Sequence, residues 1–205
     1  MLDLVDSLVQ EAEVFVETGT NVGSTLAYFA RTYPHIHCLS CEPDPEAFQH
    51  AQRNVYGLTN ITLYNQTSQQ FLETLREKHG GIFNKKILFW LDAHGYGFQW
   101  PLKEELAFIS GNFPQALILI DDFKVPGREM FGYDEYDGQI CSYEYVKDAL
   151  DLTRTYKVYY PNYTEHTSPH HPLRGWGLIA YGQEQGLRLP ERIQEKIRLS
   201  TLEEN

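Results

Sequence analysis

The chain has 205 residues, 42% of them hydrophobic, which predicts one α/β domain spanning residues 1–205 and argues against a disordered chain. The formal net charge is −11, and no stripe of Lys and Arg is visible. Because phosphate contacts need clustered basic residues, nucleic acid is not expected as a partner. No apolar run approaches the ~20 residues of a membrane span, and acids replace the basic start of a signal peptide, so no membrane contact is expected.

The chain contains three cysteines, Cys38, Cys41 and Cys141. Cys38 and Cys41 have C-x-x-C spacing, but no second pair is present to complete a zinc site. We therefore expect buried or half-buried thiols, a usage that suits a reducing cytoplasm.

Strands and helices alternate along the first 120 residues. Apolar runs predict strands at residues 14–17, 35–41, 60–65, 86–91 and 116–120. Amphipathic segments predict helices at residues 3–11, 23–33, 46–56, 68–79 and 102–110. This alternation indicates parallel βαβ units, and the continuous apolar run ALILI at 116–120 indicates a sheet covered on both faces.

The pattern changes after residue 122. Residues 123–145 are rich in Tyr, Gly and acids and are predicted to form an inserted loop. A helix is expected at 143–152, followed by strands at 156–160 and 177–181 that form a C-terminal hairpin. The charged tail at 190–205 is predicted to be a surface helix.

The first predicted strand ends in a glycine-containing turn, ETGTNVG at residues 17–23. Gly19 would allow a tight turn, and Gly23 would let the next helix begin close to a ligand. The N–H groups at that helix start favour a carboxylate or phosphate, and Glu17 is placed to meet an ammonium group. The methionine part of S-adenosylmethionine carries both a carboxylate and an ammonium group.

Glu42 ends the second predicted strand. An acid at this place can accept hydrogen bonds from both hydroxyls of a ribose. The alternative is that the glycines only shape a tight connection and that Glu42 is solvated. Together, in this order and at these strand ends, the residues favour a nucleoside ligand.

This arrangement resembles the class I S-adenosylmethionine-dependent methyltransferases over residues 14 to about 181. The resemblance implies a single Rossmann-like, doubly wound α/β sheet, mostly parallel, with an antiparallel strand from the C-terminal hairpin. It places Thr67 and Ser68 beside the adenine. The full set of residues that it implies around the methyl donor is Glu17, Gly19, Thr20, Gly23, Glu42, Thr67, Ser68 and Asp92. The G-x-G-x-x-G pattern that is common in dinucleotide oxidoreductases is absent.

Acids also end the fourth and fifth predicted strands. Asp92 follows one, and Asp121 and Asp122 end the other. Close carboxylates raise one another's pKa, and Mg²⁺ or another divalent cation would neutralise them. Such a cation could lower the pKa of a substrate hydroxyl, with His94 as the proton acceptor. The alternative is that these acids are solvated or cap helices, and that His94 has a structural role.

The acidic pattern resembles the metal-dependent sugar O-methyltransferases of the macrocin and novobiocin type. This resemblance implies that Asp92, Asp121 and Asp122 hold the cation and that His94 is the base, where some relatives have Asp. It also implies a small-molecule hydroxyl, such as that of a sugar, as the acceptor. Those enzymes have long N-terminal lids, so substrate capture is assigned here to residues 123–145, to residues 161–176 or to a neighbouring subunit of a homo-oligomer.

Two other functions stay open: a metal-independent or nitrogen-directed methyltransferase of the same fold, and a non-catalytic nucleoside-binding or assembly domain. Other residues with open roles are the histidines of a polar loop (His166, His170, His171), the tyrosines of the insertion (Tyr133, Tyr136, Tyr143, Tyr145) and two tryptophans (Trp100, Trp176). A solvated loop is expected for the histidines. The tyrosines could stack on a substrate ring or pack a dimer interface, and the tryptophans could line a pocket or lie in the core.

Overall fold

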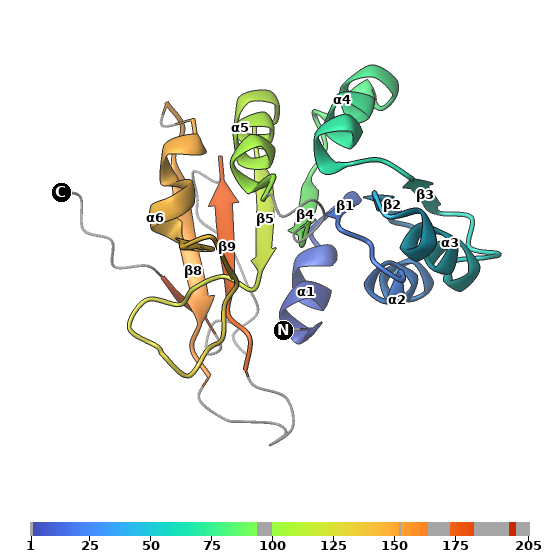
Figure 1. Cartoon of the computed structure of the whole chain (residues 1–205). Coiled ribbons are helices and arrows are strands. Elements are labelled where there is room, and N and C mark those ends of the chain that lie inside the picture. Colours follow the sequence, from blue (N-terminus) through green and yellow to red (C-terminus); the bar gives the residue numbers. More distant parts are fainter. Residues whose placement is uncertain (1, 94–99, 152, 164–172, 183–196, 200–205) are drawn as a thin grey trace.

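An eight-stranded sheet forms the centre of the molecule, in the order β10-β8-β9-β5-β4-β1-β2-β3 (Figure 1). The computed structural model describes residues 2–93, 100–151, 153–163, 173–182 and 197–199. The strands are β1 Val14–Thr18, β2 His37–Cys41, β3 Ile61–Tyr64, β4 Ile87–Leu91, β5 Ala116–Asp121, β8 Tyr156–Pro161, β9 Trp176–Tyr181 and β10 Ile197–Leu199.

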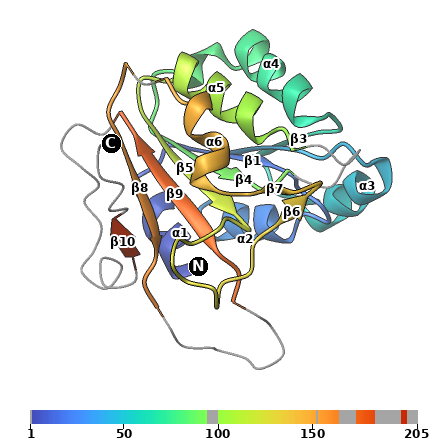
Figure 2. The same cartoon turned by 60° about the vertical axis from the view of Figure 1, so that its left-hand side comes forward.

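The sheet is parallel over its first five strands and antiparallel at its C-terminal side. β1 pairs with β2 and β4 in parallel, and β3 and β5 continue the parallel part. β9 lies antiparallel between β5 and β8, as the turned view in Figure 2 shows. The predicted doubly wound, mostly parallel sheet with an antiparallel C-terminal strand is therefore confirmed.

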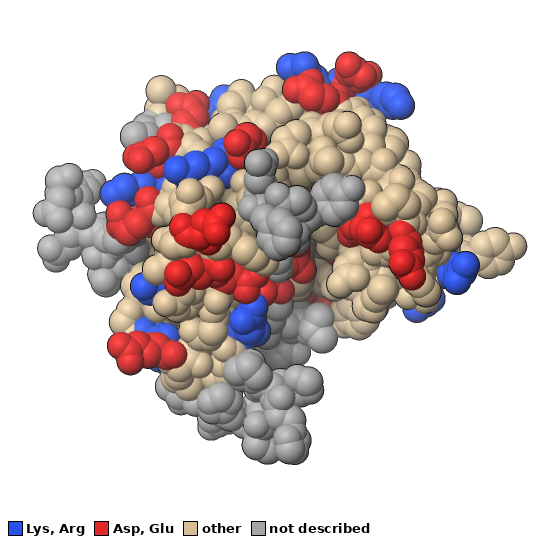
Figure 3. All heavy atoms as spheres, viewed as in Figure 1, with Lys and Arg blue, Asp and Glu red and all other residues tan. Residues whose placement is uncertain are grey.

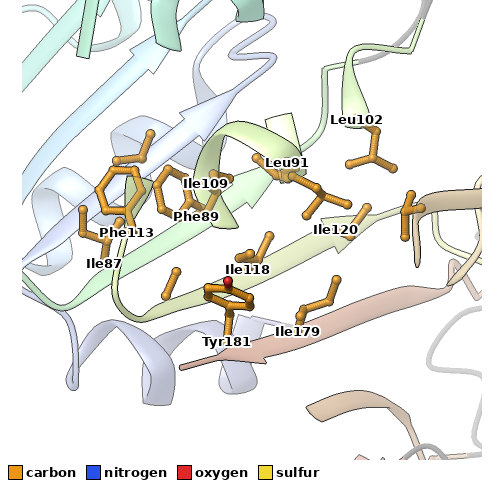
Figure 4. Packing of buried hydrophobic residues seen from close by; sticks show 14 of the residues in the cluster. Ile87, Phe89, Leu91, Leu102, Ile109, Phe113, Ile118, Ile120, Ile179 and Tyr181 are labelled. Atoms are coloured by element: carbon orange, nitrogen blue, oxygen red, sulfur yellow. The ribbon is translucent and has the colours of Figure 1, made fainter. Parts of the chain in front are cut away.

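Helices cover both faces of this sheet. They are α1 Leu2–Val9, α2 Ser24–Thr32, α3 Pro45–Asn54, α4 Ser68–Lys78, α5 Leu102–Asn112 and α6 Tyr143–Val146, with 3₁₀ turns at Gly80–Ile82 and Lys147–Ala149. Side chains of α4, α5 and α6 share one buried cluster with the sheet, and those of α1 and α2 share the other. Figure 4 shows the first cluster, in which side chains from β4, β5 and β9 pack against α5.

The alternation of side chains along each strand assigns residues to these two clusters. In β1, Val14 and Val16 belong to the cluster under α4 and α5, whereas Phe15 belongs to the cluster under α2. Cys38 and Cys41 are three positions apart in β2, so they lie on opposite faces of the sheet. Both are buried free thiols, as predicted, and this placement prevents them from sharing a metal ion.

The inserted segment is more ordered than predicted. Within residues 123–145, β6 Glu135–Tyr136 and β7 Gln139–Ile140 form an antiparallel hairpin. The two residues between them, Asp137 and Gly138, have φ values of 51° and 78°. Asp-Gly is a strong signal for a tight hairpin turn, so the sequence contained the information that the loop prediction overlooked.

Two helix predictions need correction. The helix expected at 143–152 ends as α-helix at Val146 and continues only as a short 3₁₀ turn. Within the tail predicted as a helix at 190–205, the described residues Ile197–Leu199 form β10, which pairs antiparallel with β8. Pairing with an exposed strand edge overrode the local helical pattern there. The rest of that tail lies outside the described residues.

None of the helices in the described part of the chain is long and apolar enough to cross a membrane.

Gly19 provides a test of the chain geometry at the end of β1. Its φ is 82°, and an added Cβ would lie 2.4 Å from the backbone oxygen of Asp92. Gly57 has nearly the same φ, 83°, but nothing lies within 4 Å of its Cβ position. We expect Gly57→Ala to cost roughly 1–2 kcal/mol of backbone strain, and Gly19→Ala to cost about 3 kcal/mol or more because a collision is added. Thermal unfolding of both variants measures the difference, and equal losses would contradict the role of close packing.

Candidate functional site at the carboxyl edge of the sheet

The turn after β1 passes between the ends of β2 and β4. The N–H groups of Gly19 and Thr20 both donate to the backbone oxygen of Cys41, at 3.1 and 3.0 Å. On the other side, Asp92 N–H donates to the oxygen of Thr18 at 3.0 Å. These bonds fix the turn, which is the segment that the sequence predicts to bind the methyl donor.

Gly23 has a role that the sequence did not reveal. It precedes α2 with a φ of 80°, and an added Cβ would lie 3.0 Å from the Cβ of Ala51 in α3. Glycine is therefore needed here so that α2 and α3 can pack closely. Its predicted part in bringing the helix start near a ligand stays a prediction.

Glu17 lies beneath the turn on the α2 side of the sheet. Its side chain is 2% exposed and accepts a hydrogen bond of 2.5 Å from the hydroxyl of Ser40, which is also 2.5 Å from the hydroxyl of Thr20. Burial raises the pKa of Glu17 to about 7; the Ser40 bond lowers it, and the negative charge of Glu42 raises it further. Glu17 thus sits near its midpoint at neutral pH, where a cationic partner would favour its ionised form.

Glu42 is held by backbone donors on both sides. Its Oε2 accepts from the N–H of Asn21 at 2.7 Å, and its Oε1 accepts from the N–H of Asp44 at 2.9 Å. The carboxylate therefore joins the turn after β1 to the start of α3. Each carboxylate oxygen can accept a second bond, so the predicted contacts with ribose hydroxyls are compatible with this arrangement.

Thr67 and Ser68 begin α4, and both hydroxyls already have partners. Thr67 Oγ1 accepts from the N–H of Gln70, and Gln70 Oε1 accepts from the N–H of Thr67, which together form a capping box. Ser68 is buried and donates to Glu105. These contacts give Thr67 a role as the cap of α4 and Ser68 a role in joining α4 to α5. The predicted place of both residues beside an adenine stays a prediction.

Glu105 is a buried acid that the sequence reasoning missed. It is 1% exposed on α5 and faces Ser68 of α4. Burial raises its pKa to about 7, and Ser68 and Thr18 lower it. Thr18 Oγ1 faces the carboxyl but makes no hydrogen bond of ordinary geometry with it. The available signal was helical spacing, since Glu105 lies three positions after buried Leu102 on the inward side of α5.

The predicted acidic group does come together at the ends of β4 and β5. Burial raises the pKa of Asp92 to about 9, and the charges of Asp121, Asp122 and Glu17 raise it further, against a hydrogen bond from Trp90. Burial and the negative charge of Asp122 raise the pKa of Asp121 to about 6, and the N–H of Asp122, which donates to Asp121 Oδ1 at 2.9 Å, acts in the opposite direction. These shifts show that the carboxyls influence one another.

The carboxylate of Asp122 is engaged by an arginine. Arg174 forms ion pairs with Asp122 and with Asp134, the latter at 2.5 Å. Within the described residues, no group of three His, Cys, Asp or Glu side chains is arranged to hold a metal ion. The described donors therefore do not fit the predicted three-aspartate cation site. The predicted base, His94, lies outside the described residues, as do His166, His170 and His171.

Aromatic side chains of the insertion contact the body of the protein. Tyr136 and Tyr145 pack against Trp100, with ring centroids 5.2 and 5.4 Å away. The hydroxyl of Tyr143 lies 2.8 Å from that of Tyr156. These contacts connect the insertion to the segment before α5 and to β8, and they leave the predicted roles in substrate stacking or dimer packing untested.

Two other aromatic residues have local partners. Tyr133 lies under the Nζ of Lys124, 5.2 Å from its ring centroid. Trp176 is 1% exposed, and its indole N–H donates to the hydroxyl of Tyr163 at 3.1 Å. Of the two alternatives for Trp176, a pocket wall or the core, the structure shows the core.

Acidic side chains dominate the surface near this edge. On the face shown in Figure 3, Asp and Glu gather over the half of the molecule that contains β5, α6 and the insertion, with Lys and Arg in smaller patches between them. This distribution agrees with the net charge of −11 and offers no extended basic surface on that face.

The raised pKa values of Glu17 and Glu105 predict a pH-dependent stability. Both pKa values rise from 4.5 to about 7, so between these values the folded protein keeps protons that the unfolded chain releases. The stability that these two carboxyls contribute should therefore fall as the pH rises from about 4.5 to 7 and be lost above 7, and Asp92, with its pKa of about 9, should extend the fall to higher pH. Denaturant unfolding at pH 5 and pH 8 measures this slope.

A double variant, Glu17→Gln with Glu105→Gln, should flatten the slope, whereas Glu46→Gln at an exposed position should not change it. A slope that is equal in all three proteins would show that the buried carboxyls do not hold their protons near neutrality.

Comparisons with solved structures place this geometry in a known fold. The protein is similar to the O-methyltransferase TomG from Streptomyces achromogenes, involved in tomaymycin synthesis and solved with S-adenosylmethionine: TM-score 0.61, 16% identity, covering 88% of this chain and 78% of that chain. An O-methyltransferase from Bacillus cereus in complex with S-adenosylhomocysteine has a TM-score of 0.59 at 13% identity, covering 87% and 78%. An rRNA methylase from Streptococcus thermophilus has a TM-score of 0.55 at 15% identity, covering 88% and 94%.

At these identities the similarity shows the fold, which is that of the class I methyltransferases. No protein-family model matches the chain, and a comparison with curated proteins finds no match. Because proteins of this fold include both an O-methyltransferase and an rRNA methylase, the acceptor has to be argued from the site.

Proposed function

We propose that this protein is an S-adenosylmethionine-dependent methyltransferase that methylates a hydroxyl group of a small molecule. The observation that carries the proposal is the turn after β1, which is fixed between β2 and β4 and has Glu42 bonded to its Asn21 N–H. The solved structures of the same fold with S-adenosylmethionine and S-adenosylhomocysteine support this assignment.

The residues around the turn have complementary parts in binding the methyl donor. Glu42, held by two backbone N–H groups, would accept hydrogen bonds from the ribose hydroxyls. Glu17, with a pKa of about 7, would ionise beside the ammonium of the methionine part. The first N–H groups of α2, which lack a side-chain cap, suit its carboxylate.

The bound donor supplies an electrophilic methyl group on a sulfonium. As the acceptor oxygen forms its bond to the methyl carbon, the carbon–sulfur bond breaks and the sulfur keeps the electron pair. The chain must take the hydroxyl proton. His94 is the predicted proton acceptor, and Asp121, whose pKa of about 6 leaves it mainly ionised at neutral pH, is a second candidate at the same edge.

The acceptor is proposed to be small, and a sugar is what the resemblance to the macrocin and novobiocin type enzymes suggests. The acidic surface near the site supports this choice over RNA, since an RNA substrate requires contacts with phosphates. Three buried unpaired cysteines support a reducing compartment such as the cytoplasm. A homo-oligomer is proposed because a neighbouring subunit could contribute residues that capture the substrate.

The sequence also predicts a divalent cation at Asp92, Asp121 and Asp122, and this stays a prediction. The pairing of Asp122 with Arg174 favours the metal-independent alternative. Proton removal is therefore assigned to the side chains of the chain alone.

Calorimetric titration with S-adenosylmethionine tests the shared premise. We expect Glu42→Gln to weaken binding by about tenfold or more, roughly 1.4 kcal/mol, because the amide loses the charge and one acceptor towards the ribose. Glu46→Gln, an exposed carboxyl on α3, should bind as the unchanged protein does. If the unchanged protein shows no binding at millimolar ligand, the proposed function is wrong.

The residue that takes the proton can be identified from turnover of a small hydroxylated substrate, measured as the release of S-adenosylhomocysteine. We expect His94→Gln to lower kcat by about 10²-fold or more while the affinity for S-adenosylmethionine is kept. If Asp121→Asn shows that loss and His94→Gln does not, the proton acceptor is Asp121. Turnover only with RNA would instead refute the small-molecule acceptor.

A further inference from the structure

Arg174 is held in place by the backbone on both sides. It lies two residues before β9 begins at Trp176 and forms an isolated parallel bridge with Gly132 of the insertion. The N–H of Gly132 donates to the oxygen of Leu173 at 2.7 Å, and the N–H of Gly175 donates to the oxygen of Gly132 at 2.8 Å. The arginine therefore starts from a fixed main chain, unlike a side chain on an exposed loop.

The guanidinium of Arg174 joins two carboxylates from different segments. Its Nε–H donates to Asp122, which follows β5, and its Nη2–H donates to Asp134 of the insertion at 2.5 Å. A backbone bond of 2.9 Å from Asp134 N–H to the oxygen of Asp122 holds the two acids side by side. The planar, forked guanidinium suits such a pair of acceptors better than a lysine would.

These ion pairs are partly removed from water. The side chains of Asp122 and Asp134 are only 14% and 17% exposed, although Arg174 itself is 44% exposed. The positive charge of Arg174 also lowers the pKa of Asp121, so its influence extends to the next carboxyl of the edge. Among the described residues, Arg174 thus places a positively charged side chain next to this acidic group.

We propose that Arg174 is a built-in counter-ion that occupies Asp122 and thereby excludes a divalent cation from the carboxyl edge. A divalent cation that used Asp122 would have to displace a side chain that is always charged and that is held in place by the fold. It would also be repelled by the guanidinium at short range. Of the three aspartates that suggest a cation site in the sequence, Asp122 is therefore already paired within the chain, by a residue 52 positions after it.

The proposal separates this protein from the metal-dependent enzymes that its acidic pattern resembles. In such an enzyme the charge at this edge would depend on a bound cation. Here Arg174 supplies positive charge whether or not a cation is present, and at the same time it connects the insertion to the end of β5.

Titration with Mn²⁺, followed by calorimetry and by the paramagnetic relaxation of water protons, tests the proposal. The unchanged protein should show no saturable binding up to millimolar Mn²⁺. Arg174→Gln, which keeps polarity and removes the charge, should bind at least about tenfold more tightly, equal to about 1.4 kcal/mol. Arg76→Gln removes the same charge from an exposed pair on α4 and should leave Mn²⁺ binding as it is in the unchanged protein.

Either of two results would overturn the proposal: tight Mn²⁺ binding by the unchanged protein, or a folded Arg174→Gln variant with no gain. If Arg174→Gln does not fold, Arg174→Lys decides, because a lysine keeps the charge but not the fork that holds both carboxylates. It should show measurable Mn²⁺ binding where the unchanged protein shows none, and a folded Arg174→Lys variant with no gain would overturn the proposal. None of these measurements uses methyl transfer, so they are independent of the titration with S-adenosylmethionine.

Discussion

The close approach of the turn after β1 to the ends of β2 and β4 is the constraint on which the rest of the site depends. At Gly19 the backbone passes so near the carbonyl of Asp92 that no side chain can fit, and its N–H bonds to Cys41 on the other side. This contact brings the acids at the ends of three strands to one place. In the same turn, the N–H of Asn21 lies 2.7 Å from Glu42 Oε2.

Gathering carboxyls at one buried edge creates a charge problem, and the fold solves it in three different ways. Glu17 and Glu105 retain protons near neutrality because burial penalises their charged forms. Glu42 is stabilised by backbone N–H donors, and Asp122 by a guanidinium. Each solution has a different consequence for ligands, since a proton can be displaced by a nearby cation more readily than an arginine held by the fold.

The sequence predicted what depends on local patterns and missed what depends on distant partners. Short apolar runs in the sequence located the strands of the sheet. A strand that is buried on both faces, such as β5, consists of consecutive apolar residues and is therefore easy to find. The strand β10 was missed because its structure comes from pairing with β8. The acids at strand ends were found, but Arg174 was not, since nothing in the local sequence connects it to Asp122. The bond from Ser68 to Glu105 was also missed, because it joins two helices that are far apart in the sequence.

The pairing of β10 with β8 also limits how copies of this chain could associate. Over Tyr159, Tyr160 and Pro161 the outer edge of β8 already has a partner strand from its own chain. A second copy therefore cannot extend the sheet by adding a strand directly to those residues of β8.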